Sequence, residues 1–574
     1  MNAQDLYGES LQTAYGNRNA AQTAFRMGLQ HIVRGENREA ATAFKQAVSL
    51  QPDFAAAYYN LGRVLRELGD DSEAIAAYRK ASEWDPEDPD IFYNLGNALF
   101  AAGKLDTAIK CYQRALGLNP RFVKARNNLA EALKKCGRID AAIEQYNAVL
   151  HGSSPSAETL CRMGDLFRKR RKYDQASHWY QKALQRFPDC AEAFNGLGNV
   201  LRDQNRVQEA KVCYEQAIRA APTCARAYSN LAKTCQETGD LGKALHYYDQ
   251  AVQIETDEAD IRFNRATAYL MSGNFAEGWK EYTYRFKRRQ WQSVYPRRFD
   301  QPLWDGSPYA GKKLYVHDEQ GLGDTLQFVR YLPLAAALGG ELIFETRPSL
   351  FELFKGIAGA TRVVYRTAST QPSDLDFDYY VPLLNLPWVF NTTLETVPNH
   401  VPYLFANSRK KALWRQRLND SRTFRVGIVW GGSATDEKRS CRLEDFLILQ
   451  KTNAVRLYGL QKGPAALQTL EIPGCEIPNF GPEFTDFSDT AAAIDCLDLV
   501  ISVDTAVAHL AGAMGKPVWT LLPYAPDWRW MQKRSDSPWY PTMRLFRQET
   551  PGNWQTVMQQ VATALKRAMA QPAA

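Results

Sequence analysis

The stretch at residues 320–325 (QGLGDT) combines two glycines with the carboxylate of Asp324. An apolar run at 313–317 precedes it and predicts a strand, and a helical pattern at 325–338 follows it. In such a loop, the free backbone N–H groups of Gly321 and Gly323 and the positive end of the helix favour an anion. Asp324 stands where the helix begins. It is either a helix N-cap or a base that takes the proton of an attacking hydroxyl.

Three further loops follow apolar runs in the last third of the chain. Open parallel sheets bind ligands at the carboxyl ends of their strands, and all three loops are expected at such ends. The helix that begins at Thr505 offers N–H groups to a diphosphate, and His509, one turn later, is either a ligand contact or a packing residue. The candidate donor-binding residues of these loops are Gly431, Gly432, Ser433, Lys438, Arg439, Gln461, Lys462, Asp504, Thr505, Ala506 and His509.

Two other chemistries have weaker support. Asp374, Asp376 and Asp378 form two overlapping D-x-D triplets, a spacing that can bind a divalent cation, but their place before a strand favours a loop cap. A dehydrogenase is the second alternative, but its dinucleotide-binding fingerprint needs a third glycine where this chain has Leu326. Glu345, at the end of the next predicted strand, is the only feature that favours a dehydrogenase. We therefore expect neither a metal nor a cofactor.

The elements that must position these loops are short parallel strands alternating with helices. The last helix, at about 553–569, is expected to return to the first half. A proline-rich break containing Pro387, Pro398 and Pro402 separates the two halves. Strands are predicted near 313–317, 341–346, 361–365 and 378–383 in the first half, and near 425–430, 455–460, 499–502 and 517–522 in the second.

Residues 21 to about 286 repeat with a period of 34. Small residues recur at 28, 62, 96, 130, 164, 198, 232 and 266, and alanines recur at 40, 74, 108, 142, 176, 210 and 244. An aromatic follows each of these alanines after four residues, and prolines stand at 52, 86, 120, 188 and 222. Small residues let helices approach closely, and the aromatic fills the gap between units. The pattern resembles the tetratricopeptide repeat, with seven full repeats and an incomplete eighth.

One column of this array is asparagine. An amide both donates and accepts hydrogen bonds, so the column can hold a peptide backbone whatever its side chains. Arg162 and Gly196 interrupt it, and asparagine is also a common consensus residue of this repeat. In this respect the array resembles the repeat domain of the O-GlcNAc transferases, which implies an acceptor polypeptide. The column contains Asn60, Asn94, Asn128, Asn230 and Asn264.

Composition excludes several classes of protein. The 574 residues are 45% hydrophobic and 23% charged, with a net charge of +7 spread over the whole chain. The basic stretch that contains Arg285, Lys287, Arg288, Arg289, Arg297 and Arg298 is expected to be a solvated connector, so no nucleic-acid partner is predicted. No apolar run is long enough to span a membrane, and no signal peptide is expected. The ten cysteines show no CxxC pair, which suits a reducing cytoplasm.

The sequence runs QGLGDTLQF, GIVWGG, EKRS and SVDTAVAHLAGAMGKPV resemble the bacterial heptosyltransferase-like glycosyltransferases, in the form fused to tetratricopeptide repeats. The resemblance implies a GT-B fold of two Rossmann-like halves and a bacterial counterpart of O-GlcNAc transferase. It implies that Asp324 is the catalytic base, that Lys438 or Arg439 faces the phosphates, and that residues 504–506 hold the donor. Gln461 and Lys462 would contact the base of the nucleotide.

These observations predict an α-solenoid followed by two α/β halves. The boundaries are a lead helix at 1–20, repeats at 21–290, a connector at 291–310, an acceptor half at 311–405 and a donor half at 406–574. The predicted function is metal-independent transfer of a sugar from a nucleotide-sugar to Ser or Thr of a protein. The resemblance implies that the transfer is inverting, and flagellin or another surface protein is the acceptor by analogy. The alternatives are a scaffold with an inactive transferase domain and a transferase acting on a glycan or lipid carrier.

Overall fold

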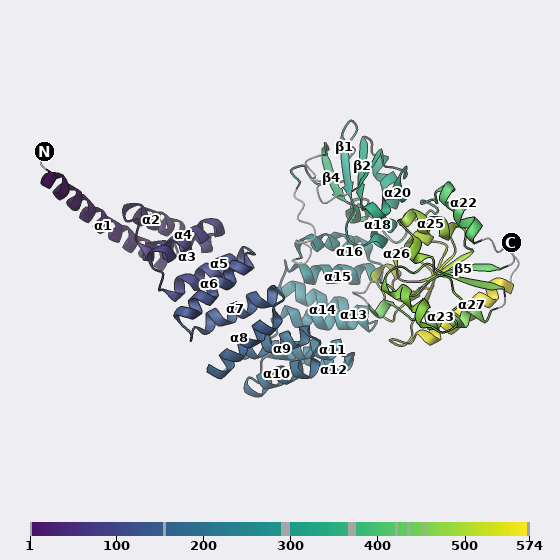
Figure 1. Ribbon diagram of the computed structural model, residues 1–574, viewed down its shortest axis with the longest axis horizontal. Helices are drawn as coiled ribbons and strands as arrows, with labels where there is room; N and C mark the ends of the chain where they lie inside the picture. Colours follow the sequence, from purple (N-terminus) through teal and green to yellow (C-terminus); the bar gives the residue numbers. More distant parts are fainter. Residues whose placement is uncertain are drawn as a thin grey trace. The chain divides into compact units, whose positions relative to one another are not determined.

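The computed structural model describes residues 3–152, 156–288, 299–365, 375–418, 423–432, 437–452 and 454–570 (Figure 1). The chain divides into two compact units, Met1–Pro222 and Thr223–Ala574. The division lies inside the repeat array, and the last two repeats belong to the same compact unit as the α/β region. The two compact units therefore differ from the predicted domains. The sequence pattern predicts that the repeats end at the connector 291–310, whereas the compact units meet at residue 222.

The first unit consists of paired helices, and each pair is one repeat. The predicted lead helix is not separate, because α1 runs without a break through residue 20 into the first repeat. The helices are α1 (Ala3–Val33), α2 (Asn37–Leu50), α3 (Ala55–Leu68), α4 (Asp71–Trp84), α5 (Pro89–Ala101), α6 (Leu105–Leu118), α7 (Val123–Lys135), α8 (Ile139–Gly152), α9 (Ala157–Lys169), α10 (Tyr173–Arg186), α11 (Ala191–Asp203) and α12 (Val207–Ala220).

The 34-residue period arises, as predicted, from small residues that make room for aromatic rings between paired helices. A Cβ atom added to Gly62 would lie 2.8 Å from the Tyr78 ring, and one added to Gly96 would lie 2.6 Å from the Tyr112 ring. Both tyrosines are fully buried, as are the alanines four residues before them. The small residue of the first helix therefore makes room for the aromatic of the second, which confirms the helical repeat array.

The second unit begins with the last repeats, α13 (Ala225–Glu237), α14 (Leu241–Ile254), α15 (Ala259–Ser272) and α16 (Phe275–Tyr282), followed by the 3-10 turn η1 (Thr283–Lys287). Trp279 and Tyr282 pack into the same core as Phe328 and Trp539 of the α/β region. Arg285 is only 1% exposed and ion-pairs with Glu319, so it is not a solvated connector residue as the basic stretch predicts. A buried arginine needs such a partner.

The first α/β half holds a parallel sheet of order β3-β2-β1-β4. The helix predicted at 325–338 begins earlier and is broken, because Pro333 has no N–H group to continue the hydrogen-bonded ladder. The elements are β1 (Lys313–His317), α18 (Leu322–Phe328), η2 (Val329–Tyr331), α19 (Leu332–Ala336), β2 (Glu341–Thr346), α20 (Pro348–Phe354), β3 (Arg362–Tyr365), β4 (Tyr379–Pro382), η4 (Leu383–Asn385) and α21 (Leu386–Val389).

The second half holds a parallel sheet of order β6-β5-β7-β8-β9. The last strand, β9, is not predicted from the sequence, since charged residues flank its apolar centre. The elements are α22 (Ser408–Arg417), β5 (Phe424–Val429), η5 (Glu437–Arg439), α23 (Leu443–Gln450), β6 (Val455–Gly459), η6 (Pro464–Leu467), α24 (Gln468–Glu471), η7 (Gly481–Glu483), α25 (Phe487–Asp495), β7 (Leu499–Val503), α26 (Ala506–Ala513), β8 (Val518–Leu522), η8 (Trp528–Trp530), β9 (Met543–Arg547) and α27 (Trp554–Ala570).

The final helix covers the second sheet. Val557 and Val561 of α27 share a core with Val426 and Ile501 of that sheet. The expectation that this helix returns to the first half is therefore wrong, because its apolar face is already buried where it stands. Within the described ranges, none of the helices combines the length and the apolar composition that crossing a membrane requires.

Candidate functional site

A cavity of about 810 Å³ lies in the second unit, where the loops after the strands of both sheets meet helix α15 of the last repeat. Its size suits a small-molecule ligand. It brings together most of the residues that the sequence predicts for the site, although they come from several separate loops. Those lining it are Gly321, Gly323, Asp324, Gly431, Gly432, Arg439, Gln461, Lys462, Asp504, Thr505, Ala506 and His509.

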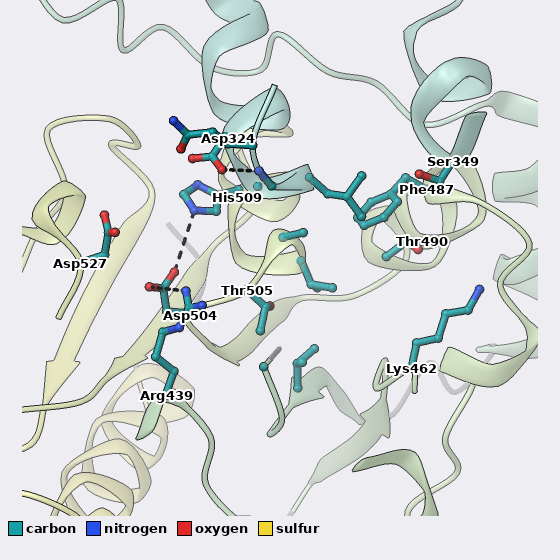
Figure 2. A pocket seen from close by; sticks show the side chains of 18 of the residues that line it. Asp324, Ser349, Arg439, Lys462, Phe487, Thr490, Asp504, Thr505, His509 and Asp527 are labelled. Atoms are coloured by element: carbon teal, nitrogen blue, oxygen red, sulfur yellow. Dashed lines mark hydrogen bonds and ion pairs between the residues drawn. The ribbon is translucent and has the colours of Figure 1, made fainter. Parts of the chain in front are cut away.

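Figure 2 shows how the labelled side chains lie in the cavity. Asp324, His509, Asp504 and Arg439 follow one another along one side. Phe487, Thr490 and Ser349 lie on the other side, away from the carboxylates. The cavity therefore has one side with the charged groups of Asp324, Asp504 and Arg439, and an opposite side that contains the aromatic ring of Phe487.

Asp324 closes the first turn of α18. Its Oδ2 atom accepts a hydrogen bond from the backbone N–H of Gly321 at 2.7 Å. Asp324 is therefore not the N-cap itself: Gly321 is the N-cap of α18, and Asp324, the third helical residue, accepts the backbone N–H of that N-cap. The same carboxylate lines the cavity, where its oxygens can accept a further hydrogen bond.

Arg529, in η8, binds the other oxygen of Asp324. Its Nη2 atom ion-pairs with Asp324 Oδ1, its Nε atom donates to Gln327 Oε1 at 2.8 Å, and its Nη1 atom donates to Asp527 Oδ1 at 2.8 Å. The arginine side chain is 9% exposed. Burial disfavours its charge, but Asp324 and Asp527 outweigh that effect and raise the pKa of Arg529. Arg529 thus holds the α18 carboxylate from the opposite half.

Asp504 follows β7 and is 5% exposed. Its Oδ2 atom lies 3.5 Å from Arg439 Nη1 and accepts no hydrogen bond from the described residues. Burial raises the pKa of Asp504, and the neighbouring Asp527 adds to the effect. The Arg439 cation is thus within ion-pair distance of this oxygen but makes no short hydrogen bond to it, so the oxygen can accept a ligand hydroxyl.

Helix α26 begins at Ala506, on the cavity wall, with Thr505 as its N-cap. The first N–H groups of a helix have no partner inside it, so this end attracts anions. Gly323 of α18 packs against α26 so closely that an added Cβ would lie 2.8 Å from His509 Cδ2. The glycine loop therefore allows the two helices to meet, as well as presenting N–H groups.

His509 both lines the cavity and packs inside the second half. Its Nδ1 atom lies 2.9 Å from the Tyr540 hydroxyl, and its ring stacks on Trp530 with centroids 5.2 Å apart. Burial lowers the pKa of His509 well below its ordinary value, and Arg529 acts in the same direction. The imidazole is therefore neutral at pH 7, so it offers a hydrogen bond rather than a charge.

The cations of the second half differ in their positions. Arg439 lines the cavity, whereas Lys438 is exposed and does not. Lys462 lines it, but its Nζ atom donates to the Phe484 carbonyl at 2.6 Å. Ser433 lies outside the described residues. Of the two cations that the sequence offers at this loop, Arg439 is therefore the one on the cavity wall.

Gln461 stabilises the loop that borders the cavity. Its Oε1 atom accepts hydrogen bonds from the backbone N–H groups of Trp430 and Gly431, and its Nε2 atom donates to the carbonyls of Gly431 and Lys462. Since the amide is engaged at both ends, its role in this arrangement is to hold two strand ends together. A direct contact with a nucleotide base requires some of these bonds to break.

Several lining residues are not predicted from the sequence. Asp527, Trp528 and Arg529 follow β8, so the strand-end rule that identifies the other loops also identifies this one. Phe263 and Thr267 come from α15 of the last repeat. No local pattern assigns them to the cavity, because a helical repeat carries the same signal whether or not a ligand site adjoins it.

In the described part of the first unit, the asparagine column is half-buried or buried, and its amides bond within the array. Asn94 Nδ2 donates to the Tyr59 hydroxyl at 3.1 Å, and Asn128 Nδ2 donates to Asn97 Oδ1 at 2.7 Å. Asn60 Nδ2 donates to the carbonyl four residues before it. In the second unit Asn230 and Asn264 are half-buried, and Asn264 stands beside Phe263 in α15.

The acidic triplets have structural partners where they are described. Asp376 ion-pairs with Lys313, and Asp378 accepts the backbone N–H of Lys313 at 2.7 Å. Asp374 lies outside the described residues. In the ranges that the structure describes, histidine, cysteine and carboxylate side chains form no cluster suited to a metal ion.

Comparison with known proteins finds repeat models in the N-terminal part of the chain and a glycosyltransferase model in the C-terminal part. Tetratricopeptide repeat models match residues 28–69, 62–103, 89–122, 111–144, 155–223 and 189–257. The glycosyltransferase family 9 (heptosyltransferase) model matches residues 446–562. Protein FlbA of Caulobacter vibrioides is 30% identical over 337 residues, which are 54% of this chain and 55% of that protein. The chain thus spans about half the length of this curated relative.

Two solved structures show weaker similarity. A tetratricopeptide repeat protein from Parabacteroides merdae has 16% identity and a TM-score of 0.40, over 43% of this chain and 98% of that chain. The Cut9–Hcn1 hetero-tetramer of the APC/C has 15% identity and a TM-score of 0.34, over 47% of this chain and 52% of that chain. The family matches are what identify the two regions. The protein combines an N-terminal array of tetratricopeptide repeats with a C-terminal glycosyltransferase family 9 (heptosyltransferase) domain.

Proposed function

We propose that this protein transfers a sugar from a nucleotide-sugar to a serine or threonine hydroxyl of a polypeptide, with inversion and without a metal ion. The observation that carries the proposal is one cavity lined by the Asp324 carboxylate, the Arg439 guanidinium and the last repeat. A protein acceptor needs a route from the repeats to the reacting carbon, and this arrangement supplies one.

The donor side is assigned to the second half. The leaving nucleotide gains negative charge as its bond to the sugar breaks, and Arg439 with the N-terminus of α26 stabilises that charge. The buried Asp504 carboxylate, beside Arg439 on the cavity wall, accepts a hydroxyl of the sugar. This assignment places the sugar beside Asp504 and the nucleotide toward the aromatic side of the cavity.

The acceptor side is assigned to α15 and the glycine loop. Phe263 and Thr267 of α15 line the cavity, and Asn264 lies between them in sequence. A polypeptide held along α15 would therefore lie beside the cavity that Asp324 lines. By analogy with the family, flagellin or another surface protein modified in the cytoplasm is the acceptor class to test first.

The reaction needs one base and no redox step. The acceptor oxygen attacks the anomeric carbon, the bond from that carbon to the nucleotide oxygen breaks, and its electron pair leaves with the nucleotide. Asp324 takes the acceptor proton. Arg529 and the Gly321 N–H hold the carboxylate in place, so the base is oriented before substrate binds.

Donor binding is the first experiment. A panel of nucleotides and nucleotide-sugars is screened by thermal unfolding with and without EDTA, on the wild type, Arg439→Ala and the neighbouring control Lys438→Ala. A ligand at one hundred times its dissociation constant adds about 2.7 kcal/mol of stability. We expect a hit that EDTA leaves unchanged, that Arg439→Ala weakens and that Lys438→Ala retains. Equal losses in both variants contradict the assignment of Arg439.

Transfer is the second experiment. The donor found in the panel is incubated with candidate acceptors, and peptides are mapped by mass spectrometry. Modified serine or threonine that disappears in Asp324→Asn supports the proposal. A donor that binds but modifies only a glycan or lipid carrier overturns the protein acceptor, and the absence of any bound donor overturns the transferase.

A further inference from the structure

Two thiols from neighbouring repeats face each other in the first unit. Cys161, in α9, and Cys190, at the start of α11, have their Sγ atoms 3.9 Å apart. Both are free thiols, with Cys161 buried and Cys190 half-buried. A disulfide holds its sulfur atoms about 2.0 Å apart, so a further approach of about 2 Å closes the bond.

The two cysteines occupy positions that aromatic rings occupy elsewhere in the array. The same 29-residue spacing joins Phe25 to Phe54 and Tyr93 to Phe122, and each of these ring pairs has centroids 4.9 Å apart. One member belongs to the first helix of a repeat, and the other precedes the first helix of the next repeat. The fifth and sixth repeats therefore touch through two thiols where other repeats touch through two rings.

The chemical environments of the two sulfurs differ. Cys190 is the N-cap residue of α11. The hydrogen bond between the two sulfurs lowers the pKa of Cys190. Burial opposes this effect, whereas the backbone N–H groups of Ala193 and Glu192 add to it. That hydrogen bond raises the pKa of Cys161, and burial adds to the effect. Cys190 is the more exposed sulfur and stands at a helix N-terminus, so it suits the role of the attacking cysteine, and buried Cys161 suits that of the resolving cysteine.

We propose that Cys161 and Cys190 form a reversible disulfide when the protein meets a hydroperoxide. The Cys190 thiolate attacks the peroxide, the O–O bond breaks, and a sulfenic acid and water result after proton uptake. The Cys161 sulfur then attacks the sulfenic sulfur and expels a second water. Two thiols and one hydrogen peroxide thus become one disulfide and two waters, and a dithiol reverses the change.

The cross-link ties α9 to the beginning of α11. These are the repeats in which Arg162 and Gly196 interrupt the asparagine column. Arg162 is itself tied to Glu131 and Glu158 by ion pairs. Oxidation therefore restrains the boundary between the fifth and sixth repeats. In a reducing compartment such a bond is transient, which suits a sensor rather than a structural support.

The test uses the full chain, reduced and then treated with hydrogen peroxide. Remaining thiols are alkylated in denaturant, and peptides are mapped. We expect a linked pair of peptides containing Cys161 and Cys190, lighter by about 2 Da than the two reduced peptides and separated by dithiothreitol. In Cys161→Ser we expect Cys190 to remain as a sulfenic acid that dimedone labels.

Cys224 is the matched control. It occupies the same N-cap position at the start of α13, but the position 29 residues before it is Asn195. Cys224→Ser is expected to leave the cross-link intact. In the native reduced protein, iodoacetamide should label Cys190 at least about fivefold faster than Cys224 at pH 7. A second readout is heat unfolding, whose midpoint should rise on oxidation of the wild type and stay constant in Cys161→Ser.

Three results overturn the proposal. The first is a Cys190 that stays alkylatable after excess peroxide. The second is its direct oxidation to sulfinic acid without a linked peptide. The third is a disulfide that joins other cysteines. Because no nucleotide or acceptor enters the assay, these results are independent of whether the transferase proposal holds.

Discussion

Asp324 and Arg529 are 205 residues apart in the chain and form an ion pair on the wall of the cavity. The carboxylate belongs to the first α/β half and the guanidinium to the second. The same guanidinium also binds Gln327 and Asp527, so one buried cation connects three side chains. This pair joins the two halves at the point where we place the reaction.

Loss of the Arg529 side chain should destabilise the protein. Arg529→Met leaves Asp324 and Asp527 without their cation, and we expect a loss of about 2–4 kcal/mol in the free energy of unfolding. Urea unfolding followed by tryptophan fluorescence measures it. The control is Arg534→Met, which breaks a more exposed pair with Asp536 and should cost less than about 1 kcal/mol. Equal losses in the two variants refute the importance of the buried pair.

Asp324→Asn should separate donor binding from transfer. An amide oxygen can still accept the Gly321 N–H, but it cannot take the acceptor proton at neutral pH. We expect a rate of transfer lower by about 10²–10⁴ at saturating donor, with the thermal shift by the donor retained. Single-turnover transfer and thermal unfolding measure the two quantities. Loss of donor binding without a lower limiting rate argues against the base.

His509 should make the protein less stable in mild acid. Its folded-state pKa lies below the ordinary value of 6.5, so below that pH the unfolded chain binds a proton that the folded chain does not. Stability therefore falls as the pH drops below 6.5, by up to about 1.4 kcal/mol per pH unit from this group. Asp504, whose pKa is raised, acts in the opposite sense.

The comparison that isolates the histidine is between the wild type and His509→Asn. Unfolding free energies are measured from pH 7.5 to pH 5. The variant should lose the part of the slope that His509 contributes. Parallel pH profiles for the two proteins contradict a neutral, buried His509.

Gly323→Ala should disturb the contact between α18 and α26. The added methyl group would lie 2.8 Å from His509 Cδ2, and we expect a loss of about 1–3 kcal/mol together with weaker donor binding. Gly117→Ala, in α6, is the control, because nothing lies within 4 Å of its added Cβ. That change should be neutral or stabilise by up to about 1 kcal/mol. Calorimetry of both variants decides the point.

Local patterns were enough for much of the fold. The 34-residue period predicts the helix pairs, because a small residue in the first helix packs against an aromatic ring sixteen residues later in the second helix. Gly62 and Tyr78 are one such pair. The strands β1 and β5 were predicted to within a residue, since buried parallel strands are continuous apolar runs. The glycine loop and Asp504 were found because strand ends in such sheets meet at one edge.

Other features depended on contacts between distant residues. Strand β9 was not predicted because its two arginines interrupt a short apolar run. Helix α27 was assigned to the wrong half because its own sequence does not indicate which sheet it covers. The sequence by itself identified four of the loops that line the cavity, because glycine, carboxylate or cation residues follow the predicted strands there, but it did not identify the loop after β8. Only the tertiary structure decided that Arg439 rather than Lys438 lines the cavity, that Arg529 binds Asp324, and that Phe263 of the last repeat closes the wall. These outcomes depend on which side chains meet after packing, and no local spacing encodes a contact across 205 residues.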